Sequence, residues 1–433
     1  MNAPNNVKLF IEYDRIRDGQ ILKELTNLYL KDEQMSTFLS VHNSAAYFKH
    51  YVGTIQTEHF TISILPKIWA KDDQPKENIM ANLLRLLLYT YLPTSLLKPE
   101  TLISPRHERN DLFELLILLY SITMERELNQ GLYRRYISIE EESRYLRGKL
   151  NLAKQLNRLD KAKFDISDFR FSANNNMNRY FSYATTLFSM FTRDLRNLHV
   201  LSSIELLFQS ESVKNDRLPA IVNFNRLNDR FQIPYNYANL IINHMRPEPG
   251  NDKRAMMMLF NMNEVFQEFF VKFIEKNRFT IFPDCEVNIK SQYKHKNFIF
   301  DHSDALRFTI PDLWIEVIKE NVKKTLVIDM KYKLMSDIKF EGSSESLDDL
   351  FKITQSDLYQ MFTYSNLYKA DGSVLVFPGD NMKLSKRYNF LKDGTPLWIF
   401  MLRLDFSDDG WENKLSKDVR SKFQEIIASF NSE

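Results

Sequence analysis

Two aspartates and a lysine in the C-terminal half of the chain have the types and spacing of a metal-dependent hydrolytic site. Asp312 follows a proline, and Asp329 stands two residues before Lys331 at the end of an apolar run. The pattern predicts two β-strands, Pro311–Ile318 and Thr325–Lys333, joined by a polar turn. Because side chains alternate between the faces of a strand, pairing these strands can bring the three charged groups together.

The chemistry that such a cluster supports is the hydrolysis of a phosphate ester. Two carboxylates at short range repel each other, and a divalent cation relieves that repulsion. Asp312 and Asp329 offer the hard oxygen ligands that Mg²⁺ prefers, so we predict both as metal ligands. The metal would polarise the phosphate while Lys331 orients or deprotonates the attacking water. An Asp-x-Lys pattern alone is more often a pair of solvated charges, but the preceding Pro-Asp and the flanking elements favour the site.

Three residues on predicted helices are further catalytic candidates. Glu264 and Glu268 lie one turn apart on a helix predicted over Arg254–Asn277, and one of their carboxylates could point toward the site. The methionines and phenylalanines of this helix are predicted to pack in the core. Gln360 lies on a second predicted helix, Ile353–Ala370, and could face the metal or a phosphate.

Basic residues near the predicted strands are candidates for contacts with a DNA backbone. They follow the predicted strand Cys285–Lys290 or end the second strand of the pair, and they are Lys290, Lys294, Lys296 and Lys333. Positive charge beside a metal centre suits contacts with phosphate groups. A solvated loop is an equally good interpretation of the basic segment between the two strands.

The composition bounds the class of protein. A chain of 433 residues suggests two or three domains, and 44% hydrophobic with 26% charged residues excludes global disorder. The formal net charge is only +2, so binding of nucleic acid would depend on local basic patches or on a partner. The single cysteine, Cys285, excludes an intrachain disulfide and fits a reducing cytoplasm, where we expect the protein to reside without a membrane anchor.

Motifs for nucleotide hydrolysis are missing from the sequence. No G-x-x-x-x-G-K-[ST] or G-x-G-x-x-G pattern occurs among the ten glycines, so any nucleotide hydrolysis that the function needs must come from another chain. The H-E-x-x-H motif of zincin metalloproteases and the G-x-S-x-G motif of serine hydrolases are also absent, so the sequence does not support either function.

A linker divides the chain into two predicted domains. The segment Arg246–Asp252 holds two prolines and a glycine in polar surroundings, which indicates a boundary. Residues 1–245 are predicted to form a mixed β and helical adaptor domain. Residues 253–433 follow the order helix, strand, strand, strand, helix, strand, so the fold class is α+β or α/β.

The Pro-Asp and Asp-x-Lys pair on adjacent strands resembles the PD-(D/E)xK restriction-endonuclease-like fold, whose core has the order α-β-β-β-α-β. Further segments resemble the McrC family, the nuclease subunit of McrBC-type modification-dependent restriction systems, in the family's order along the chain. These segments are Ile64–Ile68, Arg147–Lys149, Asn178-Arg179, Met262-Asn263 with Phe266, and Asp357–Met361. The family's Phe-Glu pair on the first nuclease helix is here Phe266-Gln267, which leaves the helix carboxylate open.

This resemblance implies an Mg²⁺-dependent DNA endonuclease subunit that works with an McrB-like AAA+ GTPase ring. In the family the GTPase recognises methylated cytosine and translocates on DNA, so the implied substrate is modified or foreign DNA, and the complex could dimerise. Asp312 and Asp329 would bind the metal and Lys331 would be the catalytic lysine. Lys67 and Arg147 are our candidates for contacts with the partner.

Three other functions stay open at this point. The chain could be a non-catalytic adaptor that activates the GTPase, an McrC-like subunit of a restriction system that reads a fixed sequence, or a stand-alone nuclease of the same fold. The intact acid and lysine set argues against the non-catalytic adaptor, because a vestigial site has no physical reason to keep three converging charges.

Overall fold

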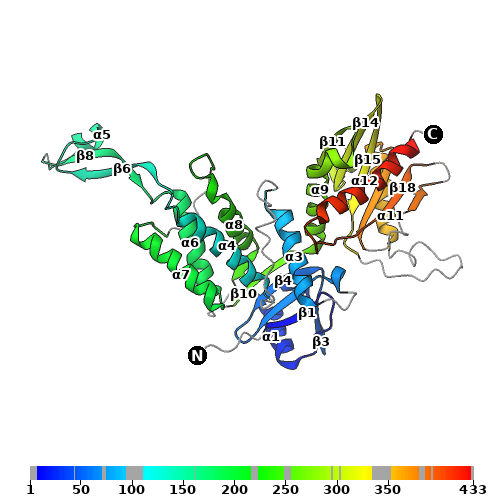
Figure 1. Cartoon of the computed structure of the whole chain (residues 1–433), viewed down its shortest axis with the longest axis horizontal. Coiled ribbons are helices and arrows are strands. Elements are labelled where there is room, and N and C mark those ends of the chain that lie inside the picture. The colour runs from blue at the N-terminus through cyan, green and yellow to red at the C-terminus, as the bar shows by residue number, and fades with distance from the viewer. Residues whose placement is uncertain are drawn as a thin grey trace. The chain divides into compact units, whose positions relative to one another are not determined.

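The structure is a computed structural model of the chain (Figure 1). The residues that it describes are 7–42, 44–70, 75–93, 111–160, 162–215, 223–247, 255–293, 296–301, 304–333, 353–379, 386–391 and 394–430. By internal contacts the chain divides into two compact units. Unit 1 holds Met1–Lys8, Thr54–Ile62 and Asp111–Met258, and unit 2 holds Leu9–Gly53, Ser63–Asn110 and Leu259–Glu433.

The two units are interleaved along the sequence. Residues 9–53 and 63–110 belong to the same unit as the predicted nuclease region, whereas the sequence-based division assigns them to the N-terminal domain. The predicted linker also differs in part, because Met245–Pro247 forms a short strand, β9. The rest of that linker, from residue 248 to residue 252, lies outside the described residues.

A six-stranded mixed sheet with the order β11-β14-β15-β16-β18-β17 lies at the centre of the C-terminal part of unit 2. The strands are β11 Glu286–Ser291, β14 Leu313–Lys319, β15 Val322–Met330, β16 Gly372–Pro378, β17 Lys386–Asn389 and β18 Pro396–Leu402. β14 is antiparallel to β11 and β15, whereas β15, β16 and β18 run parallel to one another. The predicted strand pair is therefore confirmed as the hairpin β14–β15.

The turn of this hairpin is tighter than the predicted one. Only Glu320 and Asn321 separate the two strands, and both have positive φ, 50° and 66°. Positive φ at both central residues is the geometry of the two-residue turns that match the twist of antiparallel strands.

Three helices flank the sheet: α9 Met262–Ile281, α11 Gln355–Tyr368 and α12 Trp411–Phe430. The order α9, β11, β14, β15, α11, β16 is the expected α-β-β-β-α-β order, and the fold class is confirmed as mixed α/β. A second hairpin, β12 Lys296–Asp301 with β13 Asp304–Thr309, is inserted between β11 and β14. It begins at Lys296, the last residue of the basic segment, and the sequence did not predict it.

The predicted start of the first helix is wrong. Met256–Asn261 forms strand β10, and α9 begins only at Met262, where the Asn261 side chain accepts a hydrogen bond from the backbone N–H of Asn263. A short, continuous apolar run does not distinguish a buried strand from a buried helix. The predicted helix therefore includes the residues of β10, which precede the true start of α9.

Both faces of β15 are buried from Leu326 to Met330, because helices cover this part of the sheet on both sides. Val327 packs in a cluster with Met361 and Tyr364 of α11. On the other side the buried phenylalanines of α9, among them Phe266 and Phe270, confirm the predicted packing role of that helix. The strand therefore lacks the alternation of buried and exposed residues that a one-sided sheet shows.

The N-terminal segments of unit 2 add small sheets and helices. Their elements are α1 Gly19–Lys31, α2 Met35–Phe38, β2 Leu39–His42, β3 Ala45–Phe48, η1 Lys67–Trp69 and α3 Lys76–Tyr91. A five-stranded sheet has the order β1-β5-β4-β10-β9, with β1 at Val7–Ile11, β4 at Tyr51–Gln56 and β5 at Thr61–Leu65. The division between the units passes through several of these strands.

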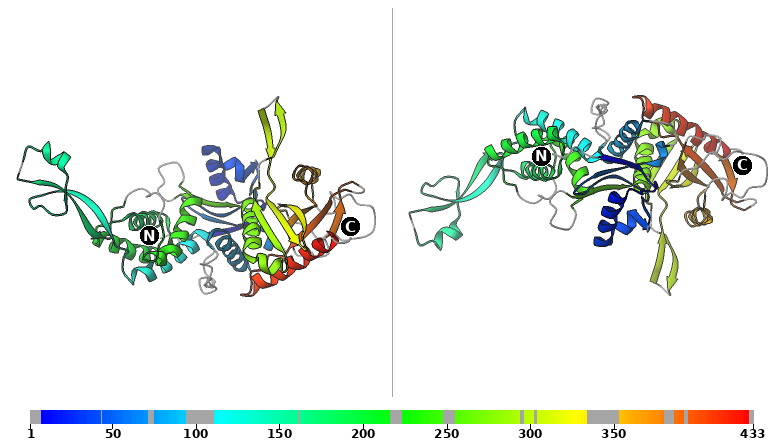
Figure 2. Two further views of the ribbon diagram at one scale, coloured as in Figure 1. Left: turned by 90° about the horizontal axis from the view of Figure 1, so that it is seen from above. Right: turned by 90° about the horizontal axis from the view of Figure 1, so that it is seen from below.

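Unit 1 combines a helical part with an antiparallel ribbon. Its elements are α4 Leu112–Leu128, β6 Arg135–Ser143, β7 Lys149–Leu150, α5 Leu152–Leu156, β8 Phe164–Ser172, α6 Asn176–Phe191, α7 Leu195–Ser210, η4 Asp229–Phe231 and α8 Gln232–His244. The ribbon β6-β8-β7 extends away from the helices of its own unit (Figure 2). Among the helices of the described residues, none has the length and hydrophobicity that a bilayer crossing requires.

Candidate metal-dependent hydrolytic site

The β14–β15 pairing brings the two predicted metal ligands together. The last paired residues at this end of the hairpin are Leu313 and Ile328, so Asp312 and Asp329 come next on the two strands. One carboxylate oxygen of Asp312 accepts a hydrogen bond from the backbone N–H of Met330 at 2.8 Å. Asp329 is only 2% exposed. The half-buried Asp312 thus lies beside the buried Asp329 at the edge of the hairpin.

Burial and mutual repulsion change the ionisation of this acid pair. Burial, together with the negative charge of Asp329, raises the pKa of Asp312 to about 7. Burial also raises the pKa of Asp329, although the neighbouring Lys331 ammonium opposes the change. Without a counter-ion the pair therefore resists carrying two negative charges, which is the electrostatic setting that favours a bound cation.

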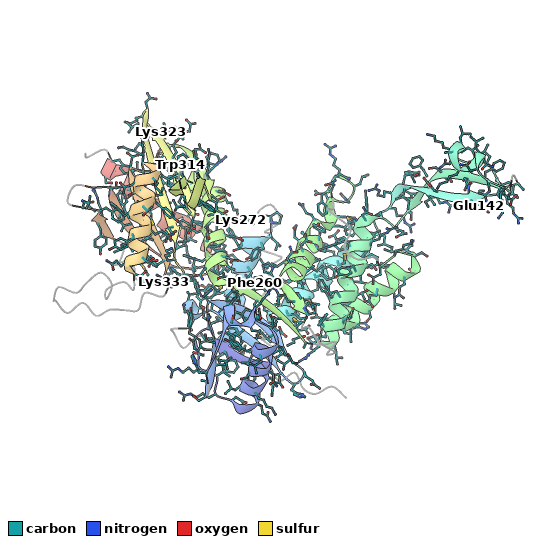
Figure 3. All side chains as sticks on the ribbon, turned by 180° about the vertical axis from the view of Figure 1, so that it is seen from behind. Glu142, Phe260, Lys272, Trp314, Lys323 and Lys333 are labelled. Carbon is teal, nitrogen blue, oxygen red and sulfur yellow. The ribbon has the colours of Figure 1, made fainter. Side chains whose placement is uncertain are left out.

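Lys331 lies directly against the acid pair. Its Nζ is 2.7 Å from Oδ2 of Asp329 and donates a hydrogen bond of 2.8 Å to Oε1 of Gln360. Burial works against the charged form of Lys331, but the carboxylates of Asp329 and Asp357 outweigh it and raise the pKa of the lysine. The lysine is consequently a fixed cation near neutral pH. Lys323 and Lys333 lie at opposite ends of β15 in Figure 3, with Lys333 at the site end beside α11.

The residue that α9 contributes to the site is Gln267. Its Nε2 donates a hydrogen bond of 2.8 Å to Oδ1 of Asp312. The two predicted helix carboxylates lie elsewhere: Glu264 accepts a hydrogen bond of 2.8 Å from the side chain of Asn261, and Glu268 is exposed one turn further along. Among the described contacts, neither glutamate reaches Asp312 or Asp329, whereas Gln267 does. The sequence signal that could have identified Gln267 is the Phe266-Gln267 pair, which stands where the McrC family has Phe-Glu.

Helix α11 supplies Gln360 as predicted, together with two residues that the sequence analysis did not select. Gln360 donates to the hydroxyl of Tyr364 at 2.7 Å and lies 3.4 Å from Oδ1 of Asp329. Tyr364 in turn donates to the backbone carbonyl of Ile310 at 2.8 Å. The spacing of four residues between Gln360 and Tyr364 places them on one face of the helix, a signal that could have identified the tyrosine.

Asp357 is the second residue of α11 that was not predicted for the site. It forms a capping box with Thr354 at the start of the helix and an ion pair with Lys333. Its other oxygen is 3.9 Å from Nζ of Lys331. The site therefore contains a third carboxylate, that of Asp357, which lies between the ammonium groups of Lys331 and Lys333.

The four predicted DNA-binding lysines have different surroundings. Lys290 is exposed on β11, with its Nζ 4.8 Å from the ring centre of Tyr293. The charge of Lys333 is paired with Asp357. Lys296 begins β12, where only the backbone is described, and Lys294 lies outside the described residues. Within the described side chains, Lys290 is thus the member of this set best placed to meet a phosphate.

The two predicted partner contacts lie in different units. Lys67, in unit 2, has its Nζ 4.0 Å from Oε2 of the buried Glu12. Arg147 lies on the ribbon of unit 1, where it is exposed and pairs with Glu141 at 2.5 Å. Arg147 is therefore available to another molecule in a way that Lys67 is not.

The donor set of the site fits a magnesium ion. Among the described residues, no group of three or more His, Cys, Asp or Glu side chains is placed to hold a metal ion. Asp312 and Asp329 nevertheless give two adjacent carboxylates, one half-buried and one buried, whose repulsion a cation would relieve, with the amide of Gln267 beside Asp312. Mg²⁺ keeps several of its waters and is commonly bound through one or two carboxylates.

The glutamine at position 267 gives a first testable prediction. We expect Gln267→Glu to place a third negative charge beside Asp312, which lowers the melting temperature of the metal-free protein and increases its stabilisation by Mg²⁺. Thermal unfolding with EDTA and with Mg²⁺ measures both effects, and each should amount to about 2 °C or more. Glu264→Gln is a control that changes the charge of an exposed residue on the same helix. An unchanged response of the Gln267→Glu variant to Mg²⁺ would contradict the assignment.

The fold and the cluster of two acids and a lysine define a mixed α/β protein with a candidate phosphodiester-hydrolysing site. The sequence model of one family, described as the McrBC 5-methylcytosine restriction system component, matches residues 46–378. The match covers well over half of the chain, and the protein belongs to this family.

One solved structure supports the fold. The chain is similar to a chain in a refined half-complex from a tetradecameric assembly of Thermococcus gammatolerans McrB AAA+ hexamers with bound McrC, at 20% identity and a TM-score of 0.67. That match covers 97% of this chain and 100% of the other. A chain from the Thermococcus gammatolerans McrBC complex matches at 22% identity and a TM-score of 0.47, over 63% of this chain and 88% of the other. No curated protein shows significant sequence similarity.

Proposed function

We propose that this chain is the Mg²⁺-dependent DNA endonuclease subunit of an McrBC-type, GTP-dependent restriction complex. The observation that supports the proposal most directly is the convergence of Asp312, Asp329 and Lys331 in one cluster around the buried Asp329. In a protein of this family, two carboxylates and a fixed ammonium at the end of a strand pair suit the hydrolysis of a phosphodiester bond.

Each side chain of the site then has a separate task. Asp312, held by Gln267 and by the backbone of Met330, and Asp329 would hold the magnesium ion. When bound, the ion would polarise the scissile phosphate and lower the pKa of a coordinated water. Lys331 stays protonated near neutral pH because its pKa is raised, so it donates hydrogen bonds to the phosphate or orients the water rather than accepting a proton.

The residues of α11 hold Lys331 for this task. Gln360 accepts a hydrogen bond from the lysine and is itself tied to Tyr364, whose hydroxyl is bound to the backbone of Ile310. This chain of hydrogen bonds restricts the rotamers of the lysine, and pre-organisation of this kind lowers the barrier of the chemical step.

A partner must supply the nucleotide chemistry. The sequence lacks the phosphate-binding glycine motifs, and the similar solved structure is an assembly of McrB AAA+ hexamers with bound McrC. We therefore assign to this chain an McrB-like AAA+ GTPase ring as partner and DNA carrying 5-methylcytosine as substrate. An McrC-like subunit that serves a sequence-specific system would share the same site and differ in the DNA that its partner reads.

The ribbon of unit 1 is our candidate for the contact with that partner. Its exposed side chains include Tyr136, Phe169 and Phe171, which are 69%, 68% and 58% exposed. Arg147 pairs with Glu141 and Asp168, whose side chains lie on the other face of the ribbon. Exposed aromatic groups that gather on one element mark surfaces for other proteins. Lys67 is better explained by its contacts within unit 2.

The test is a cleavage assay with the purified chain and its GTPase. We expect double-strand cleavage only when this chain, the partner, GTP and Mg²⁺ are all present, and only on DNA that carries methylated cytosine. Stimulated GTP turnover without any nicking would instead establish the adaptor function. Cleavage by the purified chain alone would establish a stand-alone nuclease and would contradict the proposed division of labour.

A further inference from the structure

Tyr332 connects the hydrolytic site to Glu12, the residue that follows strand β1. It stands between Lys331 and Lys333 and is only 4% exposed. Its hydroxyl donates a hydrogen bond of 2.5 Å to Oε1 of Glu12, a residue 320 positions earlier in the sequence. The two lysines face Asp329 and Asp357, whereas the tyrosine points away from these acids into the interior of unit 2.

Glu12 is a buried carboxylate with a set of partners around it. It is 2% exposed, and the same oxygen that Tyr332 contacts also accepts the backbone N–H of Lys67 at 3.0 Å. The ammonium of Lys67 lies 4.0 Å from the other oxygen and 5.0 Å from the ring centre of Tyr332. A buried charge persists only when partners satisfy it, so loss of one partner disturbs the others.

The backbone around this cluster belongs to elements far from the site in sequence. The N–H of Glu12 is bonded to the carbonyl of Leu65 at 2.9 Å, which ties the residue after β1 to the end of β5. Lys67 begins η1, the turn that follows β5. These two segments hold the tyrosine from one side, and on another side the ring of Phe266 lies 6.3 Å from the ring of Tyr332. The next residue of α9 is Gln267, the partner of Asp312.

The segment that Tyr332 anchors has limited support of its own. β15 ends at Met330, and the next residues lie outside the sheet ladder. The N–H of Lys331 is bonded to the carbonyl of Val376 at 2.9 Å, and that of Lys333 to the carbonyl of Lys331 at 2.8 Å. The side chain of Tyr332 is therefore a main constraint on how this short segment presents its two lysines.

We propose that Glu12 and Lys67 are positioning residues of the hydrolytic site, which act through Tyr332 on Lys331. This inference rests on the proposed nuclease function. Glu12 fixes the tyrosine hydroxyl, Lys67 fixes Glu12, and the anchored tyrosine keeps the ammonium of Lys331 against Asp329. Lys67 follows Pro66 in Ile64–Ile68, one of the segments that resemble the McrC family. The positioning role explains why its ammonium is directed toward the buried carboxylate of Glu12.

The test compares two variants that each remove one hydrogen bond from a tyrosine to a glutamate in unit 2. Tyr332→Phe removes the bond to Glu12, and Tyr89→Phe removes the matched bond of 2.8 Å to Glu412. Tyr89 packs against Phe269, Phe273 and Trp411. Both variants are assembled with the GTPase partner and assayed for single-turnover cleavage, DNA affinity and melting temperature.

We expect Tyr332→Phe to lower the single-turnover cleavage rate about tenfold or more, because a small displacement of a catalytic group is costly. DNA affinity and the active fraction should stay as in the wild type, and Tyr89→Phe should cleave at the wild-type rate. Hydrogen exchange of the amides at 331 and 333 should accelerate about tenfold in Tyr332→Phe alone, a readout that does not depend on activity.

Substitutions of Glu12 separate positioning from general stability. Glu12→Gln keeps an oxygen that can accept the tyrosine hydroxyl and should retain most of the cleavage rate, whereas Glu12→Ala should lose as much as Tyr332→Phe. If Tyr332→Phe and Tyr89→Phe cleave and exchange alike, the positioning role is refuted. If Asp329→Asn retains cleavage, the proposed function itself fails, so the two failures are distinguishable.

Discussion

Replacement of Asp329 by asparagine is expected to lower DNA cleavage by the complex about a thousandfold or more. The substitution removes a charged metal ligand and the ion pair of 2.7 Å that holds Lys331. Metal ions supply several kcal/mol of transition-state stabilisation, and each 1.36 kcal/mol corresponds to a factor of ten in rate, so the loss should reach about three orders of magnitude. Asp312→Ala and Lys331→Ala are expected to have comparable effects.

The design separates chemistry from assembly. Assembly with the GTPase, stimulation of GTP turnover and melting temperature should be unaffected or improved, because the variant relieves repulsion inside the site. Asp371→Asn is a matched control, since Asp371 is a carboxylate of the same unit that pairs with Lys324 at 3.1 Å and bonds the N–H of Thr325. Full cleavage by all three site variants would leave the chain with an adaptor role only.

The part of this site that the sequence predicted is the part that neighbouring residues determine. The alternation along two strands and the proximity that a hairpin imposes are sufficient to place Asp312 beside Asp329 and Lys331. Gln360 could also be predicted from local sequence, because the helix that carries it follows from the periodicity of its apolar residues. These features need only a short stretch of chain and one turn, here Glu320 and Asn321.

The residues that were missed or misplaced depend on longer-range packing. The helix that carries Gln267 begins at Met262, since the preceding residues pair as β10 within a sheet built from distant segments. Periodicity alone does not show which side of α9 meets Asp312, so the sequence favours the acidic Glu264 and Glu268, whereas the structure places Gln267 there. The contact between Glu12 and Tyr332 has no local signal, because it joins residues 320 positions apart.

The division of the chain into its two units also cannot be predicted from local sequence patterns. Prolines and a glycine near residue 250 are typical of a domain boundary in a sequence, but they do not indicate which earlier segments pack on the later core. Residues 9–53 and 63–110 join unit 2 through contacts such as the hydrogen bond from the Trp69 indole to the carbonyl of Leu404, at 2.6 Å. Contacts over such separations are set by tertiary packing alone.

The acid pair should also make the stability of the metal-free protein fall as the pH rises. The pKa of Asp312 is raised to about 7 in the folded protein, whereas an aspartate in an unfolded chain titrates near about 3.9. Between these values the folded state binds a proton that the unfolded state has released, so folding is favoured at the acid end and this contribution is lost as the pH passes through about 7. The raised pKa of Asp329 acts in the same direction.

Asp312→Asn removes the contribution of Asp312 to this dependence and is the variant that measures it. In EDTA we expect the variant to exceed the wild type in melting temperature by about 3 °C or more at pH 8, with the difference shrinking toward pH 5. Mg²⁺ should stabilise the wild type at pH 8, where the carboxylates are ionised and the cation compensates their charge, and should have much less effect on Asp312→Asn. Thermal unfolding between pH 5 and pH 8, with EDTA and with Mg²⁺, measures both differences. Parallel curves for the two proteins, with equal responses to Mg²⁺, would show that Asp312 is neither buried against a second carboxylate nor a metal ligand.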